Sequence, residues 1–381
     1  MVPGAPDASD GERPRRALLW WGIGAVVAIV ASVLIAASLI KVGYVVISPG
    51  RAYPTNDRVS LGGGQQPFTP GGVIDFVTVS EKVDVTALEK VIAERDPDAQ
   101  VSPAKQELGG RSPKEDAALN LLLMRSSKDT AAFVALSKIG YAVPTESLGA
   151  VVTEISPGSP ASAAGLLPGD SITAIDGAAI ASSQALRDAV AAHRSGDHVT
   201  FTVMQAQGDP RAVAVALADK PDSAGVGFLG VGTTDLVIPD LPFPVTLRTD
   251  DVGGPSAGLA FTLAIIDLLT PGELTGGGAV AVTGTISADG TVGPIGGIEQ
   301  KVVTVERSDD HPQLFLVPAD NNCGQPNGSC NFSDASRKAG GKLKVVAVKT
   351  LDDALTAMAQ LGGNGLALGT PGAAVSDSSP S

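Results

Sequence analysis

The segment that most constrains this chain is residues 17–40, ALLWWGIGAVVAIVASVLIAASLI, which holds no charged side chain. A helix of this length rises about 1.5 Å per residue and spans roughly 36 Å, enough for a hydrocarbon core of about 30 Å. A cleaved signal peptide is the alternative, but its apolar core is usually shorter, at about 7 to 15 residues. We therefore expect an uncleaved transmembrane helix over this segment.

The charges on either side of this helix predict its orientation. Arg13, Arg15 and Arg16 precede it, whereas only Lys41 follows directly. Because positive residues tend to stay on the cytoplasmic side, residues 1–16 are expected to form a cytoplasmic tail. The predicted location is the cell membrane, with a single pass and with everything after Lys41 extracytoplasmic.

Composition excludes several classes of function. The net charge of −13 leaves no basic stripe for phosphates, so nucleic-acid binding is not expected. His193, His198 and His311 are the only histidines, and without HExxH or CxxC spacing we expect neither a metal nor another cofactor. Cys323 and Cys330 bracket a Gly/Pro/Asn stretch, which predicts either a local disulfide outside the cytoplasm or two free loop thiols.

The length of 381 residues predicts a multidomain chain, because a single core rarely grows to that size. Residues 41–135 show strand patterns and then helical patterns near 84–95 and 114–138, and we expect an extracytoplasmic α/β spacer region without recognisable chemistry. The last twenty residues, 362–381, are mostly Gly, Ala, Ser and Pro, typical of a flexible tail.

Residues 136–220 alternate strands with small-residue turns. The stretch SPGSPASAAGLLPGDSITAIDG within residues 148–177 resembles the PDZ domain, a β-rich α+β fold. Ordinary turn residues would explain these glycines and prolines but not their order. The resemblance implies binding of an extended peptide as an added strand, with the carboxylate-binding loop near Ile139, Gly140 and Tyr141.

A serine stands at the start of a long apolar run in DVGGPSAGLAFTLAIIDLL, residues 251–269. The word GPSAG formally matches the G-x-S-x-G elbow of α/β-hydrolases. That fold needs an acid and then a histidine downstream, but only His311 follows Ser256, 55 positions later. Too little chain separates the two for the intervening strands and helices, so this fold is not expected.

A lysine can replace histidine as the base if it loses its proton near neutral pH. In GGIEQKVVTVERS, Ile298, Val302 and Val305 define an apolar helical face, and Lys301 falls within it. Burial there would lower the pKa of Lys301 toward the range useful for a general base. A snorkelling lysine, whose stem covers apolar surface while its head reaches water, is the alternative, and spacing alone favours it.

The words GGPSAG, VTGTISADGTVGPIGGIEQK and LFLVPADNN together resemble the proteolytic domain of Lon proteases, over roughly residues 230–355. The resemblance implies an α+β proteolytic domain over 221–361, with Ser256 as the nucleophile, Lys301 as its base and Thr283 supporting the lysine. We expect backbone N–H groups of Gly254, Ser256 and Ala257, near the start of a helix, to stabilise the oxyanion.

Two departures from the Lon pattern matter. Gly253 stands where many Lon enzymes have an acidic residue, and whether the nearby Asp250 and Asp251 substitute for it is open. No GxxxxGK[ST] phosphate loop occurs, so hydrolysis is not expected to need ATP.

As a whole, the chain resembles the membrane-anchored PDZ-plus-Lon family of Gram-positive bacteria. This resemblance implies an ATP-independent serine endopeptidase acting on unfolded or flexible extracytoplasmic polypeptides, with a PDZ domain for capture or gating and a homo-oligomeric ring as a plausible assembly. The alternative is a catalytically idle PDZ/Lon-like scaffold that binds peptide partners at the membrane. A cytoplasmic quality-control protease is a second alternative and requires the opposite membrane orientation.

Overall fold

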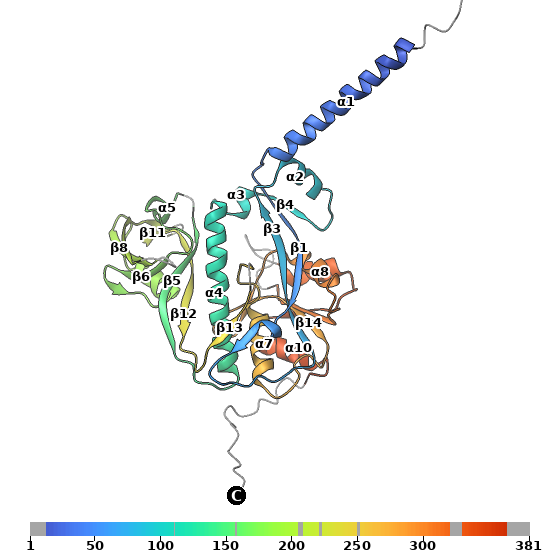
Figure 1. Cartoon of the computed structure of the whole chain (residues 1–381). Coiled ribbons are helices and arrows are strands. Elements are labelled where there is room, and N and C mark those ends of the chain that lie inside the picture. The colour runs from blue at the N-terminus through green and yellow to red at the C-terminus, as the bar shows by residue number, and fades with distance from the viewer. Residues whose placement is uncertain are drawn as a thin grey trace, which may run out of the picture. The chain divides into compact units, whose positions relative to one another are not determined.

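The computed structural model describes residues 13–109, 111–156, 158–204, 209–220, 223–249, 252–320 and 330–363. The chain divides into two compact units. The first comprises the chain up to Ile47 and Glu81–Glu107, and the second comprises Ser48–Ser80 and the chain from Leu108 onward. Because strands β1 (Tyr44–Pro54) and β3 (Val73–Val83) run through both units, each unit is discontinuous in sequence (Figure 1).

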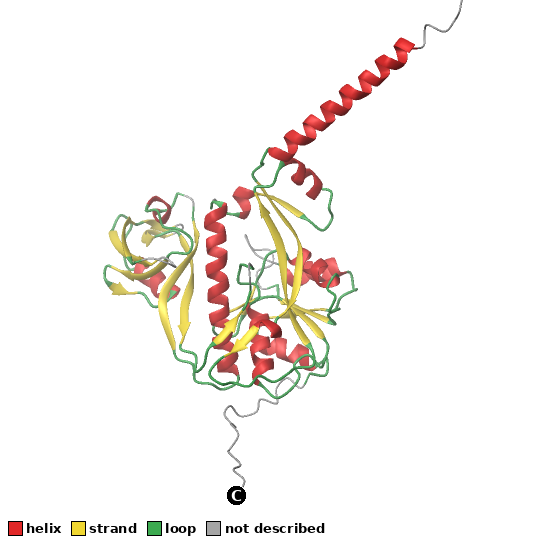
Figure 2. Cartoon of the chain, in the orientation of Figure 1, coloured by secondary structure: helices red, strands yellow, loops and turns green. Residues whose placement is uncertain are grey.

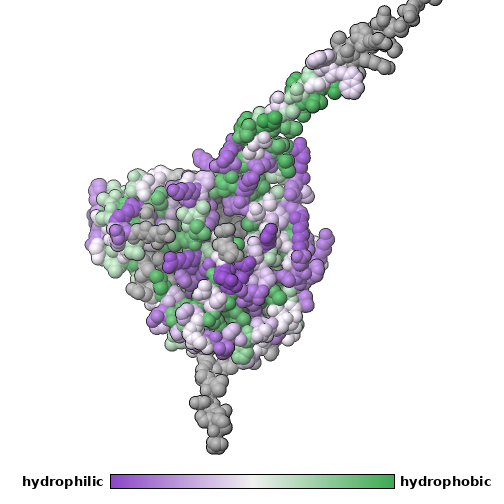
Figure 3. Space-filling view, in the orientation of Figure 1, coloured by the Kyte–Doolittle hydropathy of each residue, from purple (hydrophilic) through white to green (hydrophobic). Residues whose placement is uncertain are grey.

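The first unit begins with the apolar helix α1 (Arg13–Leu39). Its stretch Trp20–Leu39 has a mean hydropathy of 2.5, is not buried inside the molecule and shows mainly apolar colouring in Figure 3. This stretch is long and apolar enough to cross a membrane. The other elements of the unit are α2 (Ala87–Ala93), β4 (Gln100–Pro103), which pairs with the start of β1, and α3 (Ala104–Glu107).

Parallel strands form the centre of the second unit (Figure 2). They follow the order β18-β17-β14-β3, with β1 beyond β3; the new strands are β14 (Ala279–Val282), β17 (Leu314–Pro318) and β18 (Val345–Val348). Every residue of β17 is buried, as expected for a central parallel strand covered on both faces. Shorter elements of the unit are η1 (Asn56–Arg58), β2 (Val59–Leu61), β13 (Val245–Leu247), β15 (Thr285–Ile286) and β16 (Val292–Gly293).

Helices cover both faces of this sheet. Ile74 and Phe76 of β3 belong to one hydrophobic core, and Val77 belongs to another, because successive side chains of a strand point to opposite faces. The first core is completed by α4 (Pro113–Lys138), α7 (Gly258–Leu269) and α10 (Leu351–Ala359). The second is completed by α8 (Ile298–Glu306) and α9 (Asn331–Ala339).

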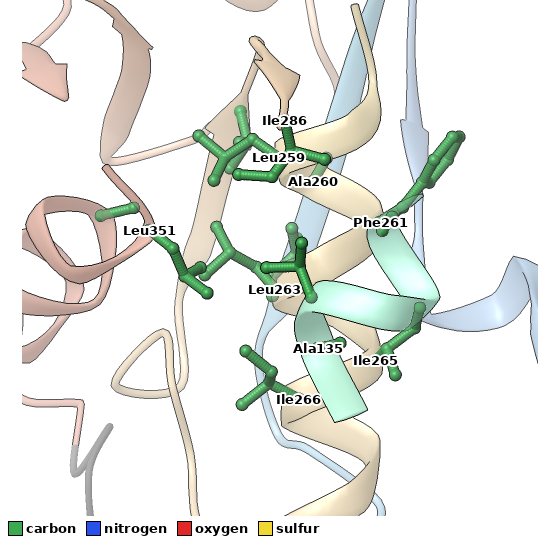
Figure 4. Packing of buried hydrophobic residues seen from close by; sticks show 14 of the residues in the cluster. Ala135, Leu259, Ala260, Phe261, Leu263, Ile265, Ile266, Ile286 and Leu351 are labelled. Carbon is green, nitrogen blue, oxygen red and sulfur yellow. The ribbon is translucent and has the colours of Figure 1, made fainter. Parts of the chain in front are cut away.

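Helices α4 and α7 pack directly on each other. Figure 4 shows Leu263, Ile265 and Ile266 of α7 gathered near Ala135 of α4. All residues of α7 except Leu269 are buried, which fits a helix that is apolar on nearly every side. Helix α4 starts at a capping box formed by Ser112 and Glu115, followed by a proline at the first helical turn.

A second sheet lies between α4 and α7 in the sequence. Its strand order is β12-β5-β6-β8-β9, and its own core contains Val152, Phe201 and Val215. Its elements are β5 (Thr145–Ile155), α5 (Pro160–Ala163), β6 (Ser171–Ile175), β7 (Ala178–Ala179), α6 (Ser183–Ala191), β8 (His198–Met204), β9 (Arg211–Ala216) and β12 (Val231–Pro239), with the hairpin β10 (Ala218–Lys220) and β11 (Ser223–Phe228) beside them. A β-rich module is present where one was expected over residues 136–220, but its sheet runs from Thr145 to Pro239.

The expectation of a separate spacer over residues 41–135 is wrong. Strand β3 pairs with β14, β2 pairs with β13, and α4 packs on α7, so residues 48–80 and 108–138 share one unit with the block 221–361. The β-rich module is inserted into that unit. The pairing was not readable because hydrogen bonds between strands about 200 positions apart leave no local pattern in the sequence. The predicted tails, 1–16 and 362–381, lie almost entirely outside the described residues.

Candidate active site

Four residues from separate parts of the chain meet at one edge of the parallel sheet. Lys301 Nζ lies 2.9 Å from Ser256 Oγ and 3.0 Å from Thr283 Oγ1, and it donates to the Val77 carbonyl oxygen at 2.6 Å. Thr283 directly follows β14, and Val77 directly follows the part of β3 that pairs with β14. The carboxyl ends of parallel strands therefore bring these groups together, as is common for sites in such sheets.

Lys301 is held inside the core rather than at the surface. It is 2% exposed, and the apolar face predicted for α8, with Ile298, Val302 and Val305, is buried against the sheet. The snorkelling alternative is therefore wrong. Burial lowers the pKa of Lys301 from 10.5 to about 7, because the charged form loses its hydration. Helix α8 starts after Gly297, whose φ of +64° is the left-handed conformation that favours glycine.

When the Lys301 amine is uncharged, the hydrogen bonds around it leave its lone pair for Ser256. Thr283 Oγ1 donates to the carbonyl oxygen of Ser256 at 3.2 Å, so toward Lys301 it can only accept. The Val77 carbonyl is also only an acceptor. A neutral amine has two N–H bonds and one lone pair; these two acceptors take both N–H bonds, and the lone pair remains for the Ser256 hydroxyl. The arrangement can thus remove a proton from Ser256.

The backbone around Ser256 agrees with the expectation for Ser256 and Ala257 but not for Gly254. Helix α7 begins at Gly258 with Ala257 as its N-cap, so Ser256 lies in the turn before the helix and does not cap it. The Gly254 N–H donates to the Asn120 carbonyl at 2.9 Å, so the expectation that it serves as an oxyanion donor is wrong for this arrangement. Within the described ranges, the N–H groups of Ser256 and Ala257 have no hydrogen-bond partner.

The residues expected to bind a peptide carboxylate lie elsewhere. Ile139 is the C-cap of α4 and is buried in the core shared with α7. Gly140 follows it at the surface, and Tyr141 packs edge-on against Phe243, with ring centroids 5.5 Å apart. That prediction is wrong, because this stretch belongs to the core around α7 and not to the edge of the inserted sheet. Asp250, Asp251 and Cys323 lie outside the described residues, so the Cys323–Cys330 disulfide stays a prediction.

Several groups at the site come from residues 48–80 and 108–138, and no sequence pattern reveals them. The Val77 group that contacts Lys301 is a backbone carbonyl, which every residue has, so no side-chain pattern could reveal it. Asn120 also acts through its backbone, and Ser127 Oγ donates to the Pro255 carbonyl at 3.1 Å. A serine within a helix carries no signal of a partner 128 positions away.

Comparison with known families and proteins agrees with this architecture. Residues 137–217 match the family described as "PDZ domain", and residues 250–360 match the "Lon protease (S16) C-terminal proteolytic domain". "Lon protease 1" of Sorangium cellulosum is 32% identical over 33% of this chain and 14% of its own length. "Lon protease" of Methylocella silvestris is 29% identical over 44% of this chain and 19% of its own length, so this chain spans less than a fifth of either relative.

A solved structure is similar to the inserted module. The crystal structure of the PDZ domain of the SdrC-like protein from Listeria monocytogenes is 26% identical, covers 23% of this chain and 87% of that chain, and has a TM-score of 0.21. The two family matches show that the chain combines a PDZ domain with a Lon-type proteolytic domain, whose matched range includes Ser256, Thr283 and Lys301.

Proposed function

We propose that this chain is a membrane-anchored, ATP-independent serine endopeptidase that uses a Ser256/Lys301 dyad. The observation that carries the proposal is the buried Lys301 amine, 2.9 Å from Ser256 Oγ and with a pKa lowered to about 7. A base works best when its pKa is near the operating pH, and a desolvated lysine meets that condition.

The reaction follows from these contacts. Neutral Lys301 takes the proton of Ser256, whose oxygen attacks the carbonyl carbon of the scissile peptide. The N–H groups of Ser256 and Ala257 stabilise the negative oxygen that forms. Lys301 then returns the proton to the leaving amine, and an ester to Ser256 remains. Water, deprotonated in turn by Lys301, hydrolyses that ester. Thr283 and the Val77 carbonyl hold the Lys301 amine with its lone pair toward Ser256.

We further propose that the substrates are unfolded or flexible polypeptides on the extracytoplasmic side. The apolar stretch Trp20–Leu39 supports a membrane anchor, and the arginines before it support a cytoplasmic N-terminus. Among the described residues there is no ATPase domain that could unfold a substrate, so unfolded or flexible polypeptides are the substrates that fit the site best. The homo-oligomeric ring expected from the Lon resemblance remains part of the proposal.

The PDZ domain would capture or gate these substrates by adding them as a strand. Strand β12 ends the sheet order and contacts helices α4 and α6, and within the described ranges no further strand pairs with its outer side. This unpaired edge is the proposed site for peptide addition, in place of Ile139, Gly140 and Tyr141. The stretch Gly227–Gly230 directly precedes β12, and its backbone is the proposed contact for a terminal carboxylate.

A peptidase assay tests this function against the idle scaffold. We expect the full chain in detergent to cleave a fluorogenic casein without ATP. Ser256→Ala and Lys301→Ala should each lose at least about a thousandfold of this activity, because each removes one half of the dyad. Lys342→Ala, at an exposed lysine, is the matched control. Equal turnover in all four proteins, or none in the wild type with any unfolded substrate, would favour the scaffold.

Orientation is tested separately in cells. Protease added to intact cells should degrade the folded part of the chain if it is extracytoplasmic. Full protection of that part in intact cells, with degradation only after lysis, would indicate the opposite orientation and favour the cytoplasmic alternative.

A further inference from the structure

We propose that helix α4 holds the nucleophile loop (residues 253–257) in its reactive geometry and that Ser127 is a positioning residue, which aims the Ser256 N–H at the oxyanion. This inference rests on the proposed peptidase function. It assigns a role in the reaction to a helix that precedes the PDZ domain in sequence and lies outside the region similar to Lon proteolytic domains.

Two hydrogen bonds connect α4 to the loop. The Asn120 carbonyl accepts from the Gly254 N–H at 2.9 Å, and Ser127 Oγ donates to the Pro255 carbonyl at 3.1 Å. Asn120 and Ser127 lie seven positions apart, which is two helical turns, so both face the loop from one side of α4. The helix therefore contacts the loop at the two residues directly before Ser256.

The Ser127 bond determines where the Ser256 N–H points. The Pro255 carbonyl and the Ser256 N–H belong to one planar trans peptide, so they point in opposite directions. Two donors hold that carbonyl: Ser127 Oγ at 3.1 Å and the Gly258 N–H at 3.2 Å. Fixing the carbonyl on the α4 side turns the Ser256 N–H to the other side, where it has no partner among the described residues and is free for a substrate oxygen.

The next peptide is fixed by the same logic from a different element. The Ser256 carbonyl accepts from the Gly284 N–H at 2.9 Å and from Thr283 Oγ1, which aims the Ala257 N–H. The Ala257 N–H is thus oriented by the segment after β14, which also contacts Lys301 through Thr283. The Ser256 N–H is oriented by α4 and by the hydrogen bond that Gly258 donates within the turn.

The surroundings of Ser127 support a specific role rather than general packing. Ser127 is 6% exposed, and a helical serine commonly bonds back to its own helix, whereas this hydroxyl bonds to the loop. A Cβ atom added at Gly258 would lie 2.8 Å from Ser127 Oγ, so the glycine leaves the room that the serine needs. The start of α4 is braced as well, because Asp116 accepts from Arg111 and from Asn120 Nδ2.

The experiment compares Ser127→Ala with Ser126→Ala, the same change one residue earlier on α4, in the full chain. Kinetics on a fluorogenic peptide are combined with inhibition by a peptide boronic acid, whose tetrahedral adduct on Ser256 places a hydroxyl where the oxyanion forms. Loss of one direct oxyanion donor costs about a hundredfold to a thousandfold in kcat. A misaimed donor should cost less, so we expect a fall in kcat of about ten- to thirtyfold, an unchanged KM and boronate affinity weakened by a similar factor.

Several results would decide the matter. The inference would be overturned if Ser127→Ala kept the wild-type kcat, or if Ser126→Ala lost as much kcat as Ser127→Ala. It would also be overturned if Ser127→Ala had a reduced kcat but bound the boronate as tightly as the wild type. If Ser127→Ala does not fold, Ser127→Cys replaces it, because cysteine is of similar size but is a weak donor. The same two comparisons with the wild type, of kcat and of boronate affinity, then decide. These failures differ from failure of the proposed function, in which the wild-type chain itself would neither cleave the peptide nor bind the boronate.

Discussion

The buried Lys301 makes a specific prediction about the pH dependence of peptide cleavage. Its pKa falls from 10.5 to about 7, which corresponds to roughly 5 kcal/mol against the charged form in the pocket. The neutral, reactive fraction is then about 10% at pH 6, about 50% at pH 7 and about 90% at pH 8. An unperturbed lysine would be neutral in only about one molecule in 3000 at pH 7.

The assay is kcat/KM for a fluorogenic peptide without ionisable side chains, measured from pH 5.5 to 9. We expect about a tenfold rise between pH 6 and 8, with a midpoint near 7 and a plateau above about pH 8.5. The rising limb reports the free enzyme, because kcat/KM follows ionisations of the unbound site.

A second buried group must be separated from Lys301 in this experiment. Burial, together with the negative charge of Asp310, raises the pKa of Asp75 to about 7, so Asp75 titrates in the same range. The control is therefore Asp75→Asn, which should keep the rising limb. The assignment to Lys301 would be refuted if Asp75→Asn lost the rising limb. It would also be refuted if kcat/KM of the wild type did not change with pH, or if it rose tenfold per pH unit up to pH 9.

Two further predictions concern stability. Lys301 binds a proton at a higher pH in the unfolded chain than in the folded one, so the wild type loses stability as pH falls from about 10 to 7. The unfolding temperature of Lys301→Met should therefore rise relative to that of the wild type as pH falls through this range, with no further relative gain below pH 7. A difference in unfolding temperature that stays constant with pH would contradict this sign. Asp75 is fully buried, and neither carboxylate oxygen has a partner among the described residues; because its folded pKa is raised, stability is lost as pH rises from about 4 to 7. Asp75→Asn should thus raise the unfolding temperature more at pH 8 than at pH 5, and equal shifts at both values would show that Asp75 is not buried as a neutral acid.

Much of the site could be predicted from sequence because its parts lie in short, distinctive segments. The apolar face of α8 includes Lys301, and Ser256 and Thr283 lie in motifs that resemble one family. The apolar stretch before Lys41 is equally local, since hydrophobic length is counted along the chain. The helices and strands after residue 255 also follow local periodicity, including the turn at Asp289-Gly290 between β15 and β16.

The errors share one physical cause. The strand pattern of residues 48–80 does not reveal that β3 pairs with β14, and the PDZ domain interrupts the unit that these residues complete. The PDZ resemblance implies a carboxylate-binding loop near Ile139 and Tyr141 from their position along the chain alone. Their side chains pack instead into the core around α7, since a residue's neighbours in space are chosen by packing and not by sequence distance.

The sequence by itself determined which chemical groups are present and which local structures carry them: a serine before an apolar helix, a lysine on an apolar face, and a segment long enough to cross a bilayer. Only the tertiary structure decided that the lysine is buried, that its amine lies beside Ser256 Oγ, and that α4 contacts the nucleophile loop. The reason is that a pKa and a peptide orientation depend on which atoms exclude water and accept hydrogen bonds. For Lys301 and Ser256 those atoms come from β3, α4 and the end of β14, far away along the chain.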